Sequence, residues 1–300
     1  MIDTVEDMSA QPDIATVPEE VLSLARAARH VAVFSGAGIS AESGVPTFRE
    51  VQTGLWERFS AQDLATPEAF EDDPGLVHTW YRWRAALIQQ VAPNPGHRAL
   101  ARWQRQLTER GGSLSIATQN VDDLHERAGA EVLAHLHGSI TAHRCAECEA
   151  PVELPAPQYD GAAAPAQPED PPQCTVCGEG LIRPGVVWFG EALPMPAFEA
   201  AAAAMQSADL ILVVGTSGLV QPAASLPLLG MERGTPLVEI NPEPTELSDA
   251  MHHRLRGPAG ELLPALVQAV TGDSPDPPDS SDSPEKTTTR TGATAPDSAR

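Results

Sequence analysis

A short apolar strand that runs into a glycine-rich turn constrains the fold more than any other feature of this sequence. Residues 31–34 (Val-Ala-Val-Phe) have the composition of a buried parallel strand, and residues 35–38 (Ser-Gly-Ala-Gly) follow directly. Because Gly36 and Gly38 have no side chains, backbone N–H groups in this turn can approach a pyrophosphate, and Ala41 fills the third position of a Gly-x-Gly-x-x-Ala motif. The feature predicts an α/β fold with a nucleotide at one edge of a parallel sheet.

The residues after this turn argue against an ordinary dinucleotide-binding dehydrogenase. Such a chain continues into an amphipathic helix and a second strand, with an acidic residue about 20 positions on. Here Gly44 and Pro46 interrupt any helix. We expect residues 42–49 to form a lid over the nicotinamide end of the nucleotide, with Phe48 as its apolar cover and Arg49 as a cationic partner. A solvated surface loop is the alternative.

The four cysteines indicate a metal site. They form two Cys-x-x-Cys pairs, Cys145 with Cys148 and Cys174 with Cys177, and two such pairs supply the four thiolates of a tetrahedral, structural zinc site. The intervening residues 149–173 are rich in Pro, Ala and acidic residues, so we expect a loop with little core of its own that zinc stabilises. Nucleic-acid-binding zinc ribbons share this ligand pattern, but the acidic spacer argues against that use.

The charge balance narrows the range of partners. The 300 residues include 19 Lys and Arg and 41 Asp and Glu, for a net charge of −22 at pH 7. A surface this acidic opposes binding to nucleic acid phosphates or to anionic membranes, and it favours basic, lysine-bearing proteins. The first 20 residues lack a secretion signal and no apolar run approaches the roughly 18 residues that span a bilayer, so we expect a cytoplasmic protein. Residues 1–17 and 271–300 are polar and are expected to be disordered.

Hydrophobic periodicity and turn residues place alternating helices and strands along the chain. We expect helices over residues 19–29, 74–91, 95–109 (with Asn94 as N-cap) and 197–207, and strands over 31–34, 114–118, 132–136, 185–189, 209–214 and 236–240. Four of the strands run into Gly36, Gln119, Gly215 and Asn241. Because the carboxyl ends of parallel strands meet at one edge of a sheet, we expect these four ends to converge on one dinucleotide crevice.

Six blocks of sequence resemble those of the sirtuin family and occur in the family's order. Residues 36–49 (GAGISAESGVPTFR) match the sirtuin signature almost letter for letter. The other blocks are residues 118–122 (TQNVD), 136–138 (LHG), the two Cys-x-x-Cys pairs, 186–190 (VVWFG) and 215–217 (GTS). The resemblance covers about residues 21–270. It implies an α/β catalytic domain (18–270) with a Rossmann-like parallel sheet domain (18–50, 93–139, 184–270) and a smaller domain made of a helical insert (51–92) and a zinc-binding insert with four cysteine ligands (140–183).

The resemblance implies that NAD binds at the sheet edge as a co-substrate. The contacts it implies are Gly36, Ala37, Gly38, Glu42, Phe48, Arg49, Gln119, Asn120, Asp122, Gly215, Thr216, Ser217, Asn241, Glu243 and Ala259. By the same resemblance, Asn120 orients the nicotinamide ribose and a bound water, and Asp122 holds the carboxamide. Ala259 stands where the family often has cysteine or another small residue. Because that residue contacts adenine through its backbone, the change matters little.

His137 is the predicted general base, with Asn120 as the second catalytic residue. It follows a predicted strand and precedes Gly138 beside the nucleotide site. The side chains of five other histidines are expected to be surface or core residues without a catalytic role: His125, His135, His143, His252 and His253. An imidazole, whose ordinary pKa is about 6.5, can accept a proton at neutral pH.

Tyr81 and Arg84 lie three residues apart on one predicted helix, so their side chains project from one face. From the residues alone, a Tyr that packs beside a solvated Arg is the simpler interpretation. The pair also resembles the Tyr-x-x-Arg of class III (desuccinylase and demalonylase) sirtuins, in which it reaches the distal carboxylate of succinyl- or malonyl-lysine. The resemblance further implies a groove in which the substrate peptide pairs as an added strand, formed by Val187, Phe189, Gly190 and Leu219.

The implied reaction is the NAD-dependent removal of succinyl and malonyl groups from protein lysines, with acetyl as a further candidate. The acyl oxygen attacks the ribose carbon that bears nicotinamide and expels nicotinamide. His137 then deprotonates a ribose hydroxyl, which attacks the imidate, and water completes the release of lysine and O-acyl-ADP-ribose. A plain deacetylase or a mono-ADP-ribosyltransferase that uses the same NAD site is one alternative. Another is an NAD-sensing binding module without turnover, which the intact His137, Asn120 and Asp122 disfavour. Acylated proteins are the expected partners, and a monomer is the expected state.

Overall fold

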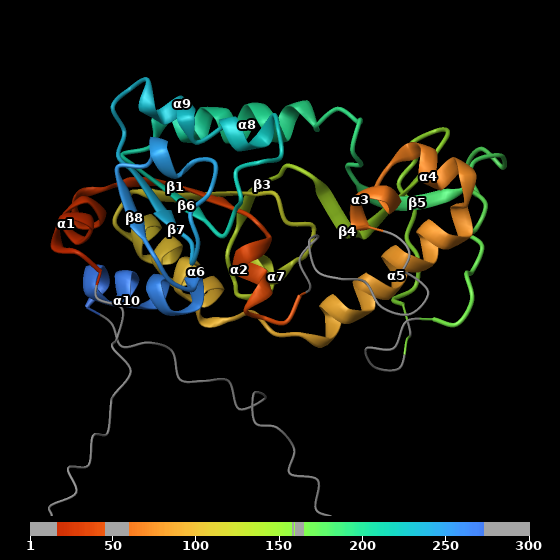
Figure 1. The fold of residues 1–300 in the computed structure, drawn as a ribbon, viewed down its shortest axis with the longest axis horizontal. Helices are drawn as coiled ribbons and strands as arrows, with labels where there is room; N and C mark the ends of the chain where they lie inside the picture. The colour runs from red at the N-terminus through yellow and green to blue at the C-terminus, as the bar shows by residue number, and fades with distance from the viewer. Residues whose placement is uncertain (1–16, 46–59, 158, 160–164, 273–300) are drawn as a thin grey trace, which may run out of the picture.

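The computed structural model describes residues 17–45, 60–157, 159 and 165–272. Phe48 and Arg49, which the sequence places in a lid, therefore lie outside the described residues, as does almost all of the two terminal segments. The described residues form a larger lobe, built on a parallel sheet, and a smaller lobe beside it (Figure 1). The predicted site residues come from both lobes.

A six-stranded parallel sheet forms the centre of the larger lobe. Its strand order is β3-β2-β1-β6-β7-β8. The strands are His30–Ser35 (β1), Ser113–Thr118 (β2), Val132–His135 (β3), Leu210–Val214 (β6), Leu237–Ile240 (β7) and His253–Leu255 (β8). At the centre, Val33 pairs with Ile116 on one side and with Leu212 on the other. The order reverses between β1 and β6, and doubly wound sheets bind ligands outside the carboxyl ends of the strands at such a switch point.

Helices cover both faces of this sheet because its strands are apolar on both faces. The helices of this lobe are α1 (Glu19–Ala27), α2 (Ala37–Ala41), α6 (Pro95–Glu109), α7 (Leu124–Arg127), α8 (Met195–Ser207), α9 (Leu228–Met231) and α10 (Ala259–Thr271). Val31 and Val33 of β1 pack into a cluster with α1, α6 and α10, and the alternate residues Ala32 and Phe34 pack with α8 and α9. Figure 1 shows α8 and α9 above the sheet and α6 and α10 below it. Burial on both faces explains the continuous apolar runs of the sequence.

The smaller lobe combines helices with a two-stranded antiparallel sheet. Its elements are α3 (Ala61–Leu64), α4 (Pro67–Asp72), α5 (Pro74–Gln90), β4 (Gly138–Cys145) and β5 (Ile182–Val186). One hydrophobic cluster contains Trp80 and Tyr81 of α5 together with Ile140 of β4 and Trp188. Because this cluster is shared, the helices and the strands of the smaller lobe pack as one unit.

The segment between the cysteine pairs packs against α5. The N–H of Glu169 donates to the Thr79 hydroxyl at 2.6 Å, and Arg82 Nη1 donates to the carbonyl of Pro155 at 2.7 Å. The described part of this segment forms only isolated β-bridges, which confirms the predicted loop. The sequence did not reveal its docking on α5, the helix that carries Tyr81 and Arg84.

The predicted helices are confirmed to within two residues, and Asn94 caps α6 as expected, since its Oδ1 accepts the N–H of Gly96 at 2.9 Å. The predicted strand over residues 185–189 is wrong in position. The observed strand β5 ends at Val186, because its antiparallel partner β4 begins at Gly138, which pairs with Val186. Beyond that point the N–H of Val187 donates to the His137 carbonyl at 2.9 Å. Strands β4 and β8 and helix α10 were not predicted.

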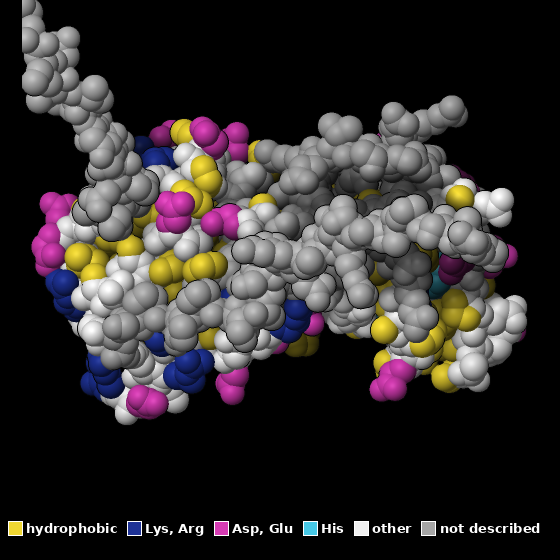
Figure 2. All heavy atoms as spheres, turned by 90° about the horizontal axis from the view of Figure 1, so that it is seen from below, with side chains coloured by type: hydrophobic (Ala, Val, Ile, Leu, Met, Phe, Trp, Pro, Cys, Tyr) yellow, Lys and Arg dark blue, Asp and Glu magenta, His cyan; other side chains and the backbone are white. Residues whose placement is uncertain are grey.

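On the face shown in Figure 2, acidic and basic side chains are interspersed over the described residues. In the described ranges, no helix combines the length and the apolar character needed to cross a bilayer.

Candidate active site

Two glycine turns lie against each other at the switch point of the sheet. The N–H of Gly38 donates to the Gly215 carbonyl at 2.7 Å, and that of Gly36 donates to the Val214 carbonyl at 3.0 Å. A Cβ atom on Gly38 would lie 2.7 Å from Gly215 Cα, and one on Gly36 would lie 2.9 Å from Gly215 O, so neither position accepts a side chain. The glycines therefore let the ends of β1 and β6 meet. The N–H groups of Gly36 and Gly38 are bonded to protein carbonyls, so a pyrophosphate at this turn would use other backbone N–H groups.

Helix α2, which Ala37 opens, brings a buried hydroxyl to the end of β2. Asn120 Nδ2 donates to Ser40 Oγ at 3.0 Å, and the N–H of Asn120 donates to Thr118 Oγ1 at 3.0 Å. Asp122 is buried beside them and accepts the N–H of Leu124 at 3.2 Å. Burial raises the pKa of Asp122, while hydrogen bonds from Leu124 and Ser40 act in the opposite direction. Sequence reasoning found Asn120 and Asp122 but missed Ser40, although it lies inside the glycine-rich block.

His137 is held as a neutral base. Its Nδ1 lies 3.0 Å from the carbonyl oxygen of Gln119. Because a carbonyl only accepts, Nδ1 carries the proton and the lone pair is on Nε2. Burial lowers the pKa of His137 below its ordinary value, against the opposing hydrogen bond to Gln119. At neutral pH the imidazole can therefore accept a proton at Nε2, as a general base must.

The side-chain amide nitrogen of Gln119 lies at this edge and has no hydrogen-bond partner among the described residues. The Nε2 atom of Gln119 is buried and makes no hydrogen bond within the described part of the chain, whereas buried polar atoms are normally paired. The same residue holds His137 through its backbone carbonyl. A ligand with an acceptor at the carboxyl end of β2 would satisfy this amide, and the predicted dinucleotide fits that requirement.

His125, which has no predicted catalytic role, is buried near the same edge of the sheet. His125 is buried, its Nε2 lies 3.0 Å from Ser35 Oγ, and its ring packs edge-on to His97 with centroids 4.9 Å apart. Burial lowers the pKa of His125 to about 4, so the ring is neutral at pH 7. His125 is thus a core residue, one of the two environments, surface or core, that were expected for it. His135 instead pairs with Glu126 at 2.6 Å.

Tyr81 and Arg84 lie on the buried side of α5. Tyr81 is 4% exposed and Arg84 is 5% exposed, so the alternative of a solvated arginine is wrong. Tyr81 Oη accepts a hydrogen bond from Trp188 Nε1 at 3.0 Å, which leaves the phenol proton to donate elsewhere. Burial raises the pKa of Tyr81, so the phenol keeps its proton at neutral pH. The Cζ of Arg84 lies 5.1 Å from the Trp80 ring centroid.

Trp188 is fixed from several sides, and sequence reasoning missed its role. Its backbone N–H donates to Glu191 at 2.8 Å, and Arg183 stacks on its ring with Cζ 3.3 Å from the centroid. Arg183 also forms a bidentate pair with Glu191, with Nη2 at 2.9 Å from Oε2. This aromatic and ionic cluster holds the phenol of Tyr81 in one place. The pairing spans distant parts of the chain, so no local pattern could indicate it.

Two of the residues predicted for a peptide groove, Val187 and Phe189, form backbone hydrogen bonds to different parts of the chain. The N–H of Val187 bonds to the His137 carbonyl, and the N–H of Phe189 bonds to the Ala65 carbonyl, both at 2.9 Å. Phe189 is 44% exposed and Leu219 is 53% exposed, and Gly190 has a φ of +90°. Phe189 and Leu219 thus present large apolar side chains at the surface, as an apolar docking surface requires.

The residues predicted for the adenosine half lie at the ends of β6 and β7 and at the start of α10. Asn241 Nδ2 donates to the Thr216 carbonyl at 2.9 Å. Ser217 is half-buried, Glu243 is exposed, and Ala259 is the buried first residue of α10. Both carboxylate oxygens of Glu42 lie 3.0 Å from the N–H of Gly260. Glu42 therefore caps α10 and ties it to α2, a structural role that the sequence did not indicate.

The four cysteine sulfurs form a cluster of the right size for zinc. Their Sγ atoms all lie within 4.8 Å of one another, with Cys145 to Cys177 at 3.7 Å and Cys148 to Cys174 at 3.8 Å. Four ligands at a Zn–S distance of about 2.3 Å in a tetrahedron are about 3.8 Å apart. The sulfurs of Cys145, Cys174 and Cys177 also accept backbone N–H groups, which favours thiolates. The donor set fits a structural zinc ion with no coordination position left for water.

Comparison with known proteins decides the family. A model of the Sir2 family matches residues 36–222. The chain belongs to the Sir2 family. Within this family, the NAD-dependent protein deacylase 1 of Pseudomonas aeruginosa is 49% identical over 253 residues, which are 83% of this chain and 97% of that protein.

Solved Sir2 structures share the fold. The crystal structure of a Sir2 homologue in complex with NAD has 43% identity and a TM-score of 0.75, and the match covers 85% of this chain and 94% of that one. A Sir2 protein bound to an acetylated peptide has 29% identity and a TM-score of 0.68, over 82% of this chain and 94% of that one. The sirtuin resemblance and the α/β fold with a cysteine cluster are thereby confirmed.

Proposed function

We propose that this protein is an NAD-dependent protein-lysine deacylase that removes succinyl and malonyl groups, with acetyl-lysine as a further substrate. The observation that carries the proposal is the imidazole of His137, held with its proton on Nδ1 by Gln119 and its lone pair on Nε2. It lies with Asn120 and Asp122 at the carboxyl edge of the sheet. Relatives that carry the name NAD-dependent protein deacylase support the same reaction class.

NAD, when bound, supplies a ribose carbon with a leaving nicotinamide. The protein's own residues orient the ribose and accept one proton from it. His137 Nε2 accepts the proton of a ribose hydroxyl, and the Gln119 carbonyl keeps Nδ1 protonated so that only Nε2 can do so. Asn120 is fixed at its side chain by Ser40 and at its backbone by Thr118, so it can orient the ribose without rearranging.

The acyl preference rests on Tyr81 and Arg84. A guanidinium and a phenol proton on one face of α5 are the donors that a second carboxylate requires, and both groups are more than nine-tenths buried. An acetyl group offers neither donor a partner. A plain deacetylase is the second candidate, favoured by the related Sir2 protein bound to an acetylated peptide.

Arg84→Met is expected to lower kcat/KM on a succinyl-lysine peptide by about 10- to 100-fold, because a hydrogen bond between charged groups contributes about 1.5–3 kcal/mol. On the matching acetyl-lysine peptide kcat/KM should change less than about threefold. Steady-state kinetics on the two peptides, alone and in competition, measure the difference.

Because both side chains are buried, each variant must also be shown to fold. Tyr81→Phe leaves Trp188 Nε1 without its acceptor and is expected to cost about 1–3 kcal/mol of stability, so each variant's melting temperature must accompany its kinetics. A loss of equal size on both peptides, in a folded variant, would show that the two residues only shape the pocket.

A further inference from the structure

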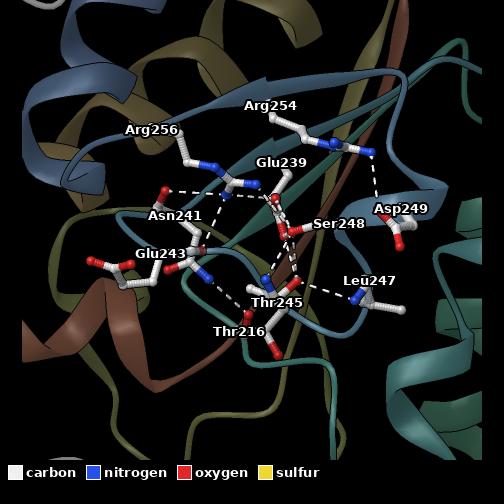
Figure 3. A network of polar contacts seen from close by, with 10 residues as sticks. All are labelled: Thr216, Glu239, Asn241, Glu243, Thr245, Leu247, Ser248, Asp249, Arg254 and Arg256. Atoms are coloured by element: carbon white, nitrogen blue, oxygen red, sulfur yellow. Dashed lines mark hydrogen bonds and ion pairs between the residues drawn. The ribbon is translucent and has the colours of Figure 1, made fainter.

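A buried carboxylate lies in the sheet at a position that the proposed reaction does not use. Glu239, in β7, is 1% exposed. Its Oε2 lies 2.7 Å from Arg256 Nη1, its two oxygens accept the Ser248 hydroxyl at 3.0 and 2.7 Å, and it also accepts the Thr245 hydroxyl (Figure 3). A buried charge persists only when it is paired and hydrogen-bonded in this way.

Arg256 connects this carboxylate to the turn after β7. Its Nη1 also reaches the carbonyls of Glu243 at 3.1 Å and Asn241 at 3.5 Å, and its Nη2 donates to Ser248 Oγ at 3.1 Å. One guanidinium thus holds both the start and the end of the segment 241–248. Figure 3 shows the segment wrapped around the Glu239 and Arg256 pair.

The same segment rests on the glycine turn after β6. Asn241 Nδ2 donates to the Thr216 carbonyl at 2.9 Å, and the N–H of Glu246 donates to the Ser217 carbonyl at 3.2 Å. A Cβ atom on Gly218 would lie 2.7 Å from Leu247 Cγ, so the two turns are in close contact. Any shift of the segment 241–248 would therefore move the turn 215–218 as well.

We propose that Glu239 and Arg256 are positioning residues for the adenosine half of NAD. Doubly wound sheets commonly use an acidic residue near a strand end to bind the ribose, but Glu239 is buried and bonded to three side chains, so it does not face a ligand. It instead anchors Arg256, which fixes the two turns that carry Thr216, Ser217, Asn241 and Glu243. The inference rests on the proposed NAD site.

Arg256→Met tests the pair in the full-length protein. The dissociation constant of NAD, measured by titration calorimetry, and the KM for NAD should both rise about tenfold or more, because displaced binding groups lose productive contacts. The kcat at saturating NAD and the KM for the acyl peptide should change less than about threefold. Arg254→Met is the matched control, since it removes the same charge from the neighbouring strand β8, where Arg254 pairs with Asp249 at the surface.

The double variant Glu239→Met/Arg256→Met separates positioning from folding. Replacing both members of a buried ion pair by apolar residues of similar size is often neutral or stabilising, so its melting temperature should recover relative to Arg256→Met while NAD binding stays weak. A double variant with wild-type stability and wild-type NAD affinity would overturn the inference. If the proposed deacylase activity fails, the wild type would bind NAD without deacylating a peptide. The NAD affinities of the wild type and of the Arg256 variants would still decide this inference.

Discussion

Replacing His137 with alanine is expected to lower kcat by about 10²- to 10⁴-fold, the usual contribution of a general base. The melting temperature and the NAD affinity should stay close to those of the wild type, because within the described residues the ring is held by a hydrogen bond to a backbone carbonyl. His137→Tyr should lose turnover in the same way. Single-turnover kinetics of lysine release, with calorimetry of NAD binding, measure both parts of the expectation.

The pH profile gives this prediction a second readout. Burial lowers the pKa of His137, so the reactive neutral ring persists as the pH falls through 6.5, and kcat/KM should decline only below the ordinary pKa of about 6.5. His253→Ala is the control, since it removes an imidazole from β8, at the far edge of the sheet. A folded His137→Ala enzyme with more than a tenth of wild-type activity would refute the assignment.

Removal of zinc is the second change with a large expected effect. Structural zinc sites contribute on the order of 10 kcal/mol to folding, and Cys145, Cys174 and Ile182 form a separate small core that depends on the site. Cys174→Ser, or treatment with a strong chelator, should unfold the smaller lobe and expose residues 149–173 to proteolysis. Deacylation should then be lost, because this segment docks on α5 through Thr79 and Arg82.

The readouts for zinc do not depend on activity. Elemental analysis of the purified protein should give one zinc per chain, and limited proteolysis should cut the metal-free protein between the cysteine pairs. The surface variant Glu179→Gln, next to the same site, is the control and should bind zinc normally. A protein folded in both lobes with far less than one zinc per chain would contradict the account.

Much of the larger lobe could be predicted from the sequence because its strands are buried on both faces. The runs over residues 31–34 and 209–214 are apolar throughout, apart from the aspartate that opens the second, and Asn94 followed by Pro95 marks the start of α6. Strand β4 was missed because its residues are largely half-buried or exposed and therefore polar. The zinc ligands were predictable because their spacing is local, with two residues between the members of each pair.

The contacts that position the site were not predictable in the same way. Trp188 meets Tyr81, Glu42 caps α10, and Arg256 pairs with Glu239, and each contact joins residues that only the folded chain brings together. The close contact of Gly36 and Gly38 with the Gly215 turn likewise joins residues far apart in the sequence. A glycine turn in the sequence indicates close approach, but the structure identifies the partner as the turn at Gly215.

The most direct test of the central claim is the stoichiometry of the reaction. The wild-type protein, incubated with NAD and a succinyl-lysine peptide, should release one nicotinamide for each lysine freed and form an equal amount of O-succinyl-ADP-ribose, as quantified by mass spectrometry. Lysine release that does not require NAD, or nicotinamide release without transfer of the acyl group to ADP-ribose, would contradict it.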